Sequence, residues 1–402
     1  MSSTDAPFWT TVAPSAWPAP PKEMTVSALS EIEACPRRWA LASAEYHDLW
    51  AGRGYPPKPA LSSLAGSVVH FAIETITKAF VQAGCASVQD PRAVQAMQEL
   101  GGYTKVVNDC IDSVTDRYNR NPRATRFLDG ARRTLRGQIP NLRIRTQTLL
   151  GRVRITATTA RTGSQTGRRP LSTGTYSELE LSAPELGWKG KPDLLVVSEH
   201  SCEIVDFKTG VHKEEHAFQV RVYALLWNRD RELNPNGHRA DKLTVVYDHG
   251  TMTVAAPSAT ELDCLATEVT TQRELACRSL SEQPPKARPG PETCRYCQVR
   301  QLCPEYWRAQ QHGWKRDSAT DNFTDAEVRI TSVHGPLSWN AIVVASRNAE
   351  PGRAVLIRGP QGAIHPHVGD TFRLLDVRVA SEDDHLTPMV LTLSTFSEAY
   401  RR

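Results

Sequence analysis

Two aspartates and a lysine near the middle of the chain have the types and spacing needed to act on one metal ion and one water molecule. Asp206 and Lys208 alternate with apolar residues in a predicted strand. Both should therefore project from one face while Val205 and Phe207 pack behind it. Asp193 precedes Asp206 by thirteen residues, which is enough for a hairpin that brings both carboxylates to one edge of a sheet.

This combination suits the hydrolysis of a phosphodiester bond. That reaction needs a hard cation on the phosphate oxygens, an activated water, and stabilisation of charge on the pentavalent state. Asp193 and Asp206 could hold Mg²⁺ or Mn²⁺, and the carbonyl of Phe207 could add a third oxygen ligand. Lys208 would orient or deprotonate the water. The alternative interpretation is structural, because an Asp-x-Lys pair on a strand is often only a solvated face.

Two predicted helices carry further polar residues. Gln219 and Tyr223 are four residues apart and share one face of helix 216–228. The alternative for this helix is an amphipathic segment with one buried tyrosine. His70 lies on an earlier helix and could equally be a packed core histidine. Glu74 follows one turn later, either as a hydrogen-bond partner of His70 or as a surface acid.

Four cysteines form a second group. Cys294-x-x-Cys297 is followed by Cys303 and Pro304, and Cys35 stands far upstream. With no secretion signal recognised, a CxxC motif with a third cysteine nearby indicates a metal site more often than a disulfide, and zinc is the usual metal. The other five cysteines have no ligand spacing and are predicted to be small core residues: Cys85, Cys110, Cys202, Cys264 and Cys277.

The order of these motifs resembles the PD-(D/E)xK nuclease superfamily, specifically its RecB-type exonuclease branch. In that branch an Asp is followed by a strand ending in Asp-x-Lys-Thr-Gly and a helix with Gln-x-x-x-Tyr. Asp193, residues 206–210 and the Gln219–Tyr223 pair match these elements in order. The resemblance covers about residues 25–310. It implies an α/β restriction-endonuclease-like core, a central mixed sheet flanked by helices, whose Gln219 helix supports the site and touches the DNA backbone.

The same resemblance implies two metal centres. A Gly-x-x-x-His helix in this branch supplies an imidazole to the catalytic metal, which matches Gly66 and His70. A neutral imidazole suits Mn²⁺ better than Mg²⁺. In AddB-like and CRISPR-associated members, one cysteine before the core and three after it hold a [4Fe-4S] cluster. That arrangement would make the cluster's ligands Cys35, Cys294, Cys297 and Cys303, tying the N-terminal helices to the region behind the core.

Positive charge is concentrated in one stretch of the chain. The net charge is +4, yet residues 117–169 hold fourteen arginines, no lysine and one acid. A nucleic-acid surface is predicted there, although arginines that pair with acids elsewhere would give the same composition. Residues 163–169 are expected to form a loop near the substrate. The arginines expected on helix are Arg120, Arg123, Arg126, Arg132, Arg133 and Arg136, and those expected on a strand are Arg143, Arg145, Arg152 and Arg154.

The chain divides into four predicted segments. Residues 1–24 should be disordered or extended, 25–312 should form the nuclease domain, and 313–323 should form a linker. Residues 324–402 contain five short alternating segments, which predict an OB-like β-barrel with Trp339 and Phe372 as stacking or core residues. The predicted helices of the nuclease domain are 25–46, 62–83, 91–150, 216–228 and 259–280, and its strands are 175–181, 187–197, 203–208, 243–247 and 252–255.

The sequence thus predicts a Mg²⁺- or Mn²⁺-dependent DNA nuclease, an exonuclease acting on single strands or duplex ends. It has no Gly-x-x-x-x-Gly-Lys-Ser/Thr loop, so unwinding would need a helicase partner in DNA repair, recombination or anti-phage defence. The absence of a membrane-length apolar run predicts a cytoplasmic location. One alternative is a noncatalytic DNA-binding iron–sulfur subunit of such a complex, and another is a zinc-stapled interaction module.

Overall fold

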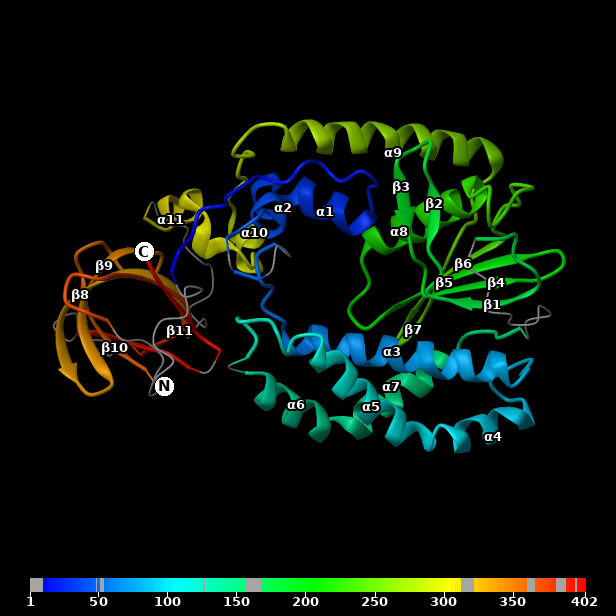
Figure 1. The fold of residues 1–402 in the computed structure, drawn as a ribbon, viewed down its shortest axis with the longest axis horizontal. Helices are drawn as coiled ribbons and strands as arrows, with labels where there is room; N and C mark the ends of the chain where they lie inside the picture. Colours follow the sequence, from blue (N-terminus) through cyan, green and yellow to red (C-terminus); the bar gives the residue numbers. More distant parts are fainter. Residues whose placement is uncertain are drawn as a thin grey trace.

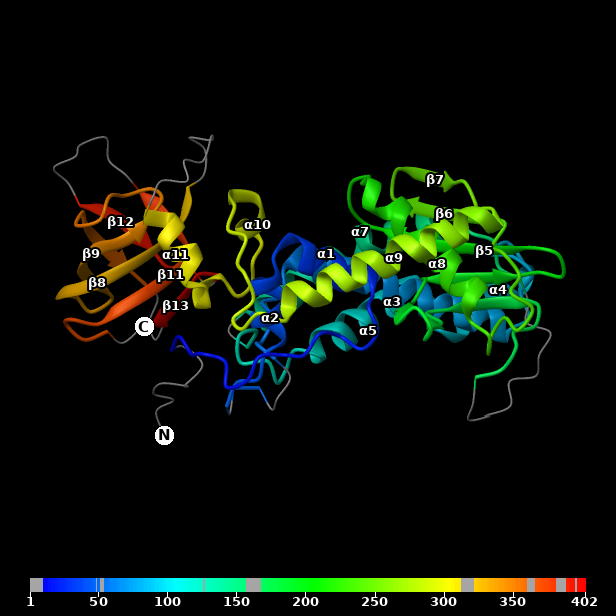
Figure 2. The same ribbon diagram turned by 90° about the horizontal axis from the view of Figure 1, so that it is seen from above.

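The computed structural model describes residues 10–47, 49–50, 54–125, 127–156, 168–311, 322–359, 366–380, 388–394 and 396–402. A helical and sheet-containing region lies beside a small β-barrel (Figures 1 and 2). The helices are α1 (Val26–Ala34), α2 (Pro36–Ser43), α3 (Leu61–Gln82), α4 (Pro91–Glu99), α5 (Gly102–Asp116), α6 (Leu128–Gly137), α7 (Ile139–Leu150), α8 (Glu214–Arg229), α9 (Ala259–Leu280), α10 (Pro291–Arg295) and α11 (Pro304–Gln311). The strands are β1 (Gly174–Ser177), β2 (Leu181–Ala183), β3 (Trp188–Gly190), β4 (Leu194–Val197), β5 (Cys202–Lys208), β6 (Lys242–Tyr247), β7 (Gly250–Val254), β8 (Phe323–Gly335), β9 (Ser338–Ser346), β10 (Ala354–Arg358), β11 (Thr371–Ala380), β12 (Met389–Thr392) and β13 (Glu398–Arg401).

The predicted site strand, β5, lies in the middle of a mixed sheet of order β1-β4-β5-β6-β7. It pairs antiparallel with β4 and parallel with β6. The β4–β5 hairpin closes where Ser198 N–H donates to the Ser201 carbonyl at 2.8 Å. Its register sets Leu194 opposite Val205, which brings Asp193 to the Asp206 end of β5. The predicted hairpin is confirmed.

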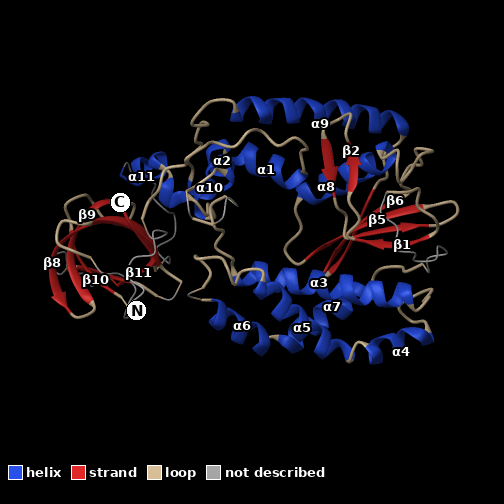
Figure 3. Ribbon diagram, viewed as in Figure 1, coloured by secondary structure: helices blue, strands red, loops and turns tan. Residues whose placement is uncertain are grey.

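Helices cover both faces of this sheet (Figure 3). Leu194, Val205 and Phe207 join the core formed by α3 to α7. Leu195 and Ile204, one position along each strand, join the core formed by α1, α8 and α9. Since apolar residues alternate between two covered faces, both sides of β4 and β5 are buried, as in other α/β proteins. The expected central mixed sheet flanked by helices is confirmed.

Two elements predicted as continuous are divided by prolines. The predicted helix 25–46 is two helices, since Cys35 is extended (φ −164°) and Pro36 begins α2. The predicted strand 187–197 is also two strands, interrupted by 191–193. Proline lacks an N–H donor and disfavours helical backbone before it, which accounts for the first break, and its missing donor interrupts the strand ladder at Pro192. As a result β3 leaves the central sheet and pairs with β2 in a separate two-stranded sheet.

The C-terminal strands close a barrel. The strands lie in the order β12-β10-β9-β8-β11, and β11 pairs with β12 to close the barrel. The β10–β12 pair is parallel. Each of the five predicted segments forms one of these strands, whereas β13, which pairs with β11, was not predicted. Trp339 and Phe372 are 7% and 4% exposed in the barrel core. Of the two roles considered for these rings, the structure supports the core role.

Buried ion pairs join the barrel to the rest of the molecule. Arg123, with no exposed side-chain surface, donates through Nε to Glu398 Oε1 of β13 at 2.6 Å. Arg300, between Cys297 and Cys303, contacts Asp325 at 2.6 Å and Asp376 at 2.8 Å. These contacts fix the barrel against the cysteine-containing segment, since a buried charge is stable only beside its partner.

The described part of the N-terminal segment is extended rather than disordered. Thr10 bridges to Arg401, Ala16 to Glu45, and Met24 to Trp188, so the segment runs from the barrel to the central region. Residues 313–321 of the predicted linker 313–323 lie outside the described residues, and its last residue, Phe323, already begins β8, so the predicted boundary is one residue too late. Helix α3 is long and apolar enough to cross a membrane by length and composition, but half of its apolar window is buried inside the protein. Packing against the sheet accounts for that composition.

Candidate functional site

Helix α3 approaches the end of β5 at Gly66. A Cβ atom at Gly66 would lie 3.0 Å from Thr209 Oγ1, so glycine here permits a close approach of the helix to the segment after β5. One turn further along, His70 Nδ1 lies 3.0 Å from Asp193 Oδ1. The Gly66-x-x-x-His70 spacing therefore sets an imidazole against the first of the two carboxylates.

The two aspartates meet at the end of β5. Asp193 Oδ2 accepts a hydrogen bond from the backbone N–H of Phe207 at 2.5 Å. Asp206 is 3% exposed, and its Oδ2 lies 2.7 Å from Lys208 Nζ. Phe207 is buried behind them, with its ring edge-on to His70. His70, Asp193, Asp206 and Lys208 thus form one connected cluster, although the motifs that carry them are far apart in sequence.

The protonation of this cluster follows from burial and mutual charge. Burial and the neighbouring Asp193 raise the pKa of Asp206 to about 7, against the opposing charge of Lys208. Burial alone would raise the pKa of Asp193 and lower that of His70. Their hydrogen bond and opposite charges reverse both effects, so the pKa of Asp193 is lowered and the pKa of His70 is raised. Two close buried carboxylates favour an added positive charge.

Helix α8 supports the cluster from the other side. Gln219 Nε2 donates to Tyr223 Oη at 2.6 Å, and burial followed by the charge of Asp206 raises the pKa of Tyr223. The helix can come this close because position 190 is glycine: a Cβ there would lie 2.6 Å from Tyr223 Cε1 and 2.9 Å from Leu226 Cδ1. The predicted Gln219–Tyr223 pair therefore lies next to the predicted carboxylates.

Replacing Gly190 by alanine is expected to lower the free energy of unfolding by about 1–3 kcal/mol, because an added methyl group must push Tyr223 or the whole of α8 outward. Urea denaturation measures this loss. Gly250→Ala is the matched control, since a Cβ at Gly250 meets no atom within 4 Å. Equal losses in the two variants would show that α8 is not packed against residue 190 as described.

The donor set suits a divalent metal ion in its chemistry. Asp206 Oδ2 is buried and has an ion pair with Lys208 but no hydrogen bond. Carboxylates are ligands of both Mg²⁺ and Mn²⁺, and the added imidazole suits Mn²⁺ better. Within the described residues, however, no three Asp, Glu, His or Cys side chains are close enough as they stand to hold an ion. The ligand roles of His70, Asp193, Asp206 and the Phe207 carbonyl therefore remain predictions.

Two residues beside the cluster were not predicted from the sequence. Glu178 N–H donates to the Asp193 carbonyl at 3.0 Å, and Glu178 Oε2 pairs with Lys191 Nζ at 2.8 Å. Burial and the charge of Asp193 raise the pKa of Glu178, against the pull of Lys191. Lys191 lies two residues before Asp193 but was given no role, and Glu178 follows the short strand β1 with no motif of its own. Glu74 pairs with Lys78 at 2.5 Å. This contact supports the interpretation of Glu74 as a surface acid rather than as a hydrogen-bond partner of His70.

The four predicted cluster cysteines converge. Cys35, Cys294, Cys297 and Cys303 are all buried and line one small internal cavity. Burial raises the pKa of the thiols of the last three. They do not form a finished metal site among the described residues. Of the other cysteines, Cys264 is exposed on α9, so its prediction as a core residue was wrong: it faces solvent on an amphipathic helix.

The arginine-rich stretch is partly engaged in ion pairs. Arg132 pairs with Asp116 at 3.0 Å and Arg136 with Asp112 at 2.7 Å, as the alternative interpretation required. Arg133 is exposed on α6. Arg123 is buried, so it is not part of a DNA surface. Arg126 and most of the predicted loop 163–169 lie outside the described residues.

The prediction of a strand in the arginine-rich stretch was also wrong. Arg143 and Arg145 lie on α7, while Arg152 and Arg154 follow it without forming a strand. Arg120 and Arg123 lie in the turns between α5 and α6 rather than on a helix. Alternating arginines suggested a strand, but Leu142, Thr146 and Leu149 supply a helical buried face that packs against α3 and α5.

The family model of the PD-(D/E)XK nuclease superfamily matches residues 23–304. This chain belongs to that superfamily, and membership indicates a nuclease, a phosphodiester hydrolase whose substrate would be DNA. The match spans α1 to the start of α11 and so includes the carboxylate cluster and all four converging cysteines. No curated protein matches the chain.

Solved structures give only faint likenesses. They include the tetrameric p202 HIN2 (14% identity, 20% of this chain and 41% of that chain, TM-score 0.16) and SSO0001 (16% identity, 32% and 60%, TM-score 0.21). The p204 HINb domain gives 10% identity, 57% and 92% coverage, and a TM-score of 0.17. The first two matches span less than two thirds of those chains. At these TM-scores none of the likenesses carries an argument.

Proposed function

We propose that this chain is a Mg²⁺- or Mn²⁺-dependent deoxyribonuclease of the RecB-type branch, cutting from DNA ends. The observation that carries the proposal is the connected cluster at the end of β5: His70 against Asp193, and Asp206 against Lys208, each contact within 3.0 Å. Such a cluster is costly to bury unless it binds a counter-charge, and clusters of this kind are concentrated at functional sites.

In this proposal each residue has one task. Asp193, Asp206, His70 and the carbonyl of Phe207 hold the divalent cation, which when bound neutralises the phosphate and lowers the pKa of a water. Lys208, whose Nζ is held beside Asp206, orients that water as an ammonium group, or takes its proton when Lys208 is the neutral amine. Gln219 and Tyr223 keep α8 against the site and contact the DNA backbone.

The direct test incubates anaerobically purified full-length protein with linear duplex, linear single-stranded and circular DNA, with Mg²⁺, Mn²⁺ or EDTA. The proposal expects metal-dependent loss of linear DNA from its ends and little attack on circles. Binding to all three DNAs without cleavage under any metal would favour the noncatalytic DNA-binding subunit instead. Cutting of circular DNA at the same rate as linear DNA would overturn the exonuclease assignment.

The four converging cysteines are proposed to hold a [4Fe-4S] cluster rather than zinc. The motif order and Pro304 after Cys303 support this, as does the shared cavity lined by Cys35, Cys294, Cys297 and Cys303. The cluster would join α1 and α2 to the segment after α9, closing a loop whose conformational entropy otherwise opposes docking. In this reading the cluster stabilises the fold and takes no part in cleavage.

Changing any one of the four cysteines to alanine is expected to bleach the visible absorbance of the anaerobic protein and lower its melting temperature. Cys264→Ala is the matched control, because Cys264 is exposed on α9 and should leave both unchanged. Absorbance spectra with iron and sulfide analysis provide the measurement. One zinc per chain with no iron would contradict the cluster and weaken the placement in this branch.

The remaining parts of the chain fit this proposal as follows. Residues 25–312 form the nuclease domain, 1–24 its N-terminal extension, and a linker from 313 leads to the barrel, which begins with β8 at Phe323 rather than at 324. The strand order and parallel β10–β12 pair of the barrel support an OB-like fold. Arg132, Arg133 and Arg136 on α6 would contribute phosphate contacts when DNA competes with their ion pairs. A helicase partner and a cytoplasmic role in repair or defence complete the proposal.

A further inference from the structure

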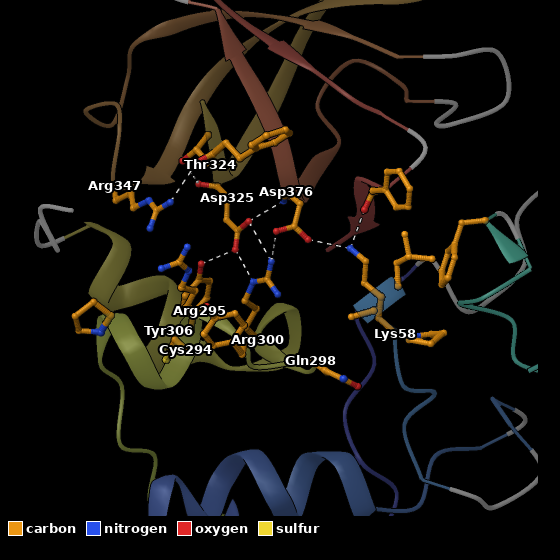
Figure 4. A pocket seen from close by; sticks show the side chains of 18 of the residues that line it. Lys58, Cys294, Arg295, Gln298, Arg300, Tyr306, Thr324, Asp325, Arg347 and Asp376 are labelled. Carbon is orange, nitrogen blue, oxygen red and sulfur yellow. Dashed lines mark hydrogen bonds and ion pairs between the residues drawn. The ribbon is translucent and has the colours of Figure 1, made fainter. Parts of the chain in front are cut away.

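A pocket of about 430 Å³ lies where the barrel meets the cysteine-containing segment. Figure 4 shows that its wall combines the ends of barrel strands with the segment around α10 and with α11. Residues of α6, the start of α3 and the segment before α3 also line it. The catalytic cluster contributes none of the lining residues, so this is a separate site. Its volume falls in the range of pockets that enclose a small ligand.

The pocket gathers exposed aromatic side chains. Among the described residues, the large hydrophobic side chains left exposed include three aromatic ones: Tyr296 (67%), Phe396 (57%) and Phe323 (47%). All three line this pocket, and Phe127 lies beneath Phe396 with ring centroids 6.4 Å apart. Exposed apolar side chains that gather in one place mark interaction sites, whereas scattered ones do not. Flat rings at a pocket mouth are suited to stacking against a flat ligand.

The same pocket carries an excess of positive charge. Its lining includes four basic residues and two acids. The acids, Asp325 and Asp376, hold Arg300, and Asp376 also holds Lys58. Arg295 lies over the Tyr296 ring at 5.4 Å. Arg347 also lines the pocket and donates to the carbonyl of Phe323 at 3.2 Å, so Arg295 and Arg347 each contact a residue that carries one of the exposed rings. Guanidinium groups bind phosphate through charge-assisted hydrogen bonds.

We propose that this pocket binds one nucleotide unit of a single-stranded nucleic acid, with its base against the exposed aromatic rings and its phosphate at Arg295 and Arg347. Base stacking on aromatic side chains together with cationic groups that follow the backbone is how proteins hold single strands without reading sequence. Binding at this pocket does not depend on the proposed nuclease function. Its purpose does, because the pocket would hold the substrate strand away from the cutting site.

In OB-like barrels the loop between the first two strands, here the β8–β9 turn, is part of the usual nucleic-acid surface. The pocket lies elsewhere. Phe323 begins β8 and Arg347 follows the end of β9, so both lie at the open end of this antiparallel hairpin. The β8–β9 turn, with exposed Leu337, is at the opposite end. Fifteen of the twenty-one lining residues come from outside the barrel, including Tyr296 between two of the converging cysteines. The site therefore exists only when barrel and nuclease region are docked.

The test measures binding of a labelled oligothymidylate of about twenty nucleotides by full-length protein carrying Asp206→Asn, in Ca²⁺, so that cleavage plays no part. Phe323→Ala with Phe396→Ala is expected to weaken binding about tenfold, the scale of losing one stacked base. Phe396→Tyr keeps the ring and should bind normally. Leu337→Ala is the matched control: it removes an exposed apolar side chain at the far end of the same hairpin.

Two further arms identify the ligand. An oligonucleotide with one 5-iodouracil, irradiated in the complex, should crosslink to Tyr296, Phe323 or Phe396. Thymidine monophosphate should compete only weakly if a strand rather than a free nucleotide is bound. Unchanged affinity in the double variant, with no crosslink to these rings, would overturn the proposal and leave the patch to a protein partner. Because binding is read in a cleavage-deficient background, failure here is separate from failure of the nuclease assignment.

Discussion

Asp206→Ala and Lys208→Ala should each reduce DNA cleavage by a factor of about 10³ or more, the scale of removing a central electrostatic group. Asp206 is almost fully buried and paired with Lys208 at 2.7 Å, so neither side chain can be replaced by a neighbour. DNA affinity should change little, because both residues act on the metal and the water. Initial cleavage rates and binding measured in Ca²⁺ separate the two effects.

Glu203→Ala provides the control from the same strand. Glu203 pairs with Lys242 at 2.8 Å on β6, away from the cluster, and its loss should leave cleavage near the normal rate. Wild-type-like cleavage by either Asp206→Ala or Lys208→Ala would rule out the assigned site.

The stability of an Asp206 variant shows whether a loss of cleavage reflects lost chemistry or a lost fold. Burial and Asp193 raise the pKa of Asp206 to about 7 from an ordinary value of 3.8, so its ionised form destabilises the metal-free protein. That cost is present above about pH 7 and disappears at low pH, where the carboxyl is protonated. Metal-free Asp206→Asn should therefore be at least as stable as the wild type at pH 8. Thermal unfolding at pH 8 checks this, and a lower melting temperature would mean that the variant is misfolded.

Arg123→Met should lower the free energy of unfolding by about 3 kcal/mol, because the buried Glu398 loses its hydrogen-bonded partner and keeps only the longer ion pair with Lys58 at 3.6 Å. Glu398 accepts two hydrogen bonds from this guanidinium, at 2.6 and 2.8 Å, and Arg123 also donates to the Gln298 carbonyl at 2.5 Å. Chemical denaturation gives the size of the loss. The exposed Arg120 in the same turn is the matched position, and Arg120→Met should cost little.

The double variant Arg123→Met/Glu398→Met should recover most of that stability, since both charges are removed together. A single variant as stable as the wild type would show that this ion pair does not hold the barrel in place.

The Arg123–Glu398 ion pair should also make the free energy of unfolding depend on pH. Burial alone would raise the pKa of Glu398, but Arg123 holds it below the ordinary 4.5. The contribution of the pair is complete above pH 4.5 and is lost as the pH falls through the lower folded-state pKa. The stability difference between wild type and Glu398→Gln should therefore be largest near neutral pH and shrink in acid. A difference that stays constant across this range would contradict the assignment.

The sequence by itself determined which side chains could do chemistry and on which elements they lie. Alternation along β5 placed Asp206 and Lys208 together, and the distance to Asp193 predicted the hairpin that the structure contains. Helices α3, α8 and α9 were predicted within a few residues of their ends. These features depend on local periodicity and on turn residues, which a sequence displays directly.

Tertiary structure decided what lies beside what. The arginine-rich stretch was a uniform feature of the sequence, yet Arg123 is buried against Glu398, 275 residues away, while Arg133 stays exposed. Glu178 lies at the site through a contact with Asp193 that no motif indicates. The aromatic pocket is likewise lined by segments that share no motif. Charge pairing and burial depend on contacts between distant segments, and composition does not encode which of several equivalent arginines will find a partner.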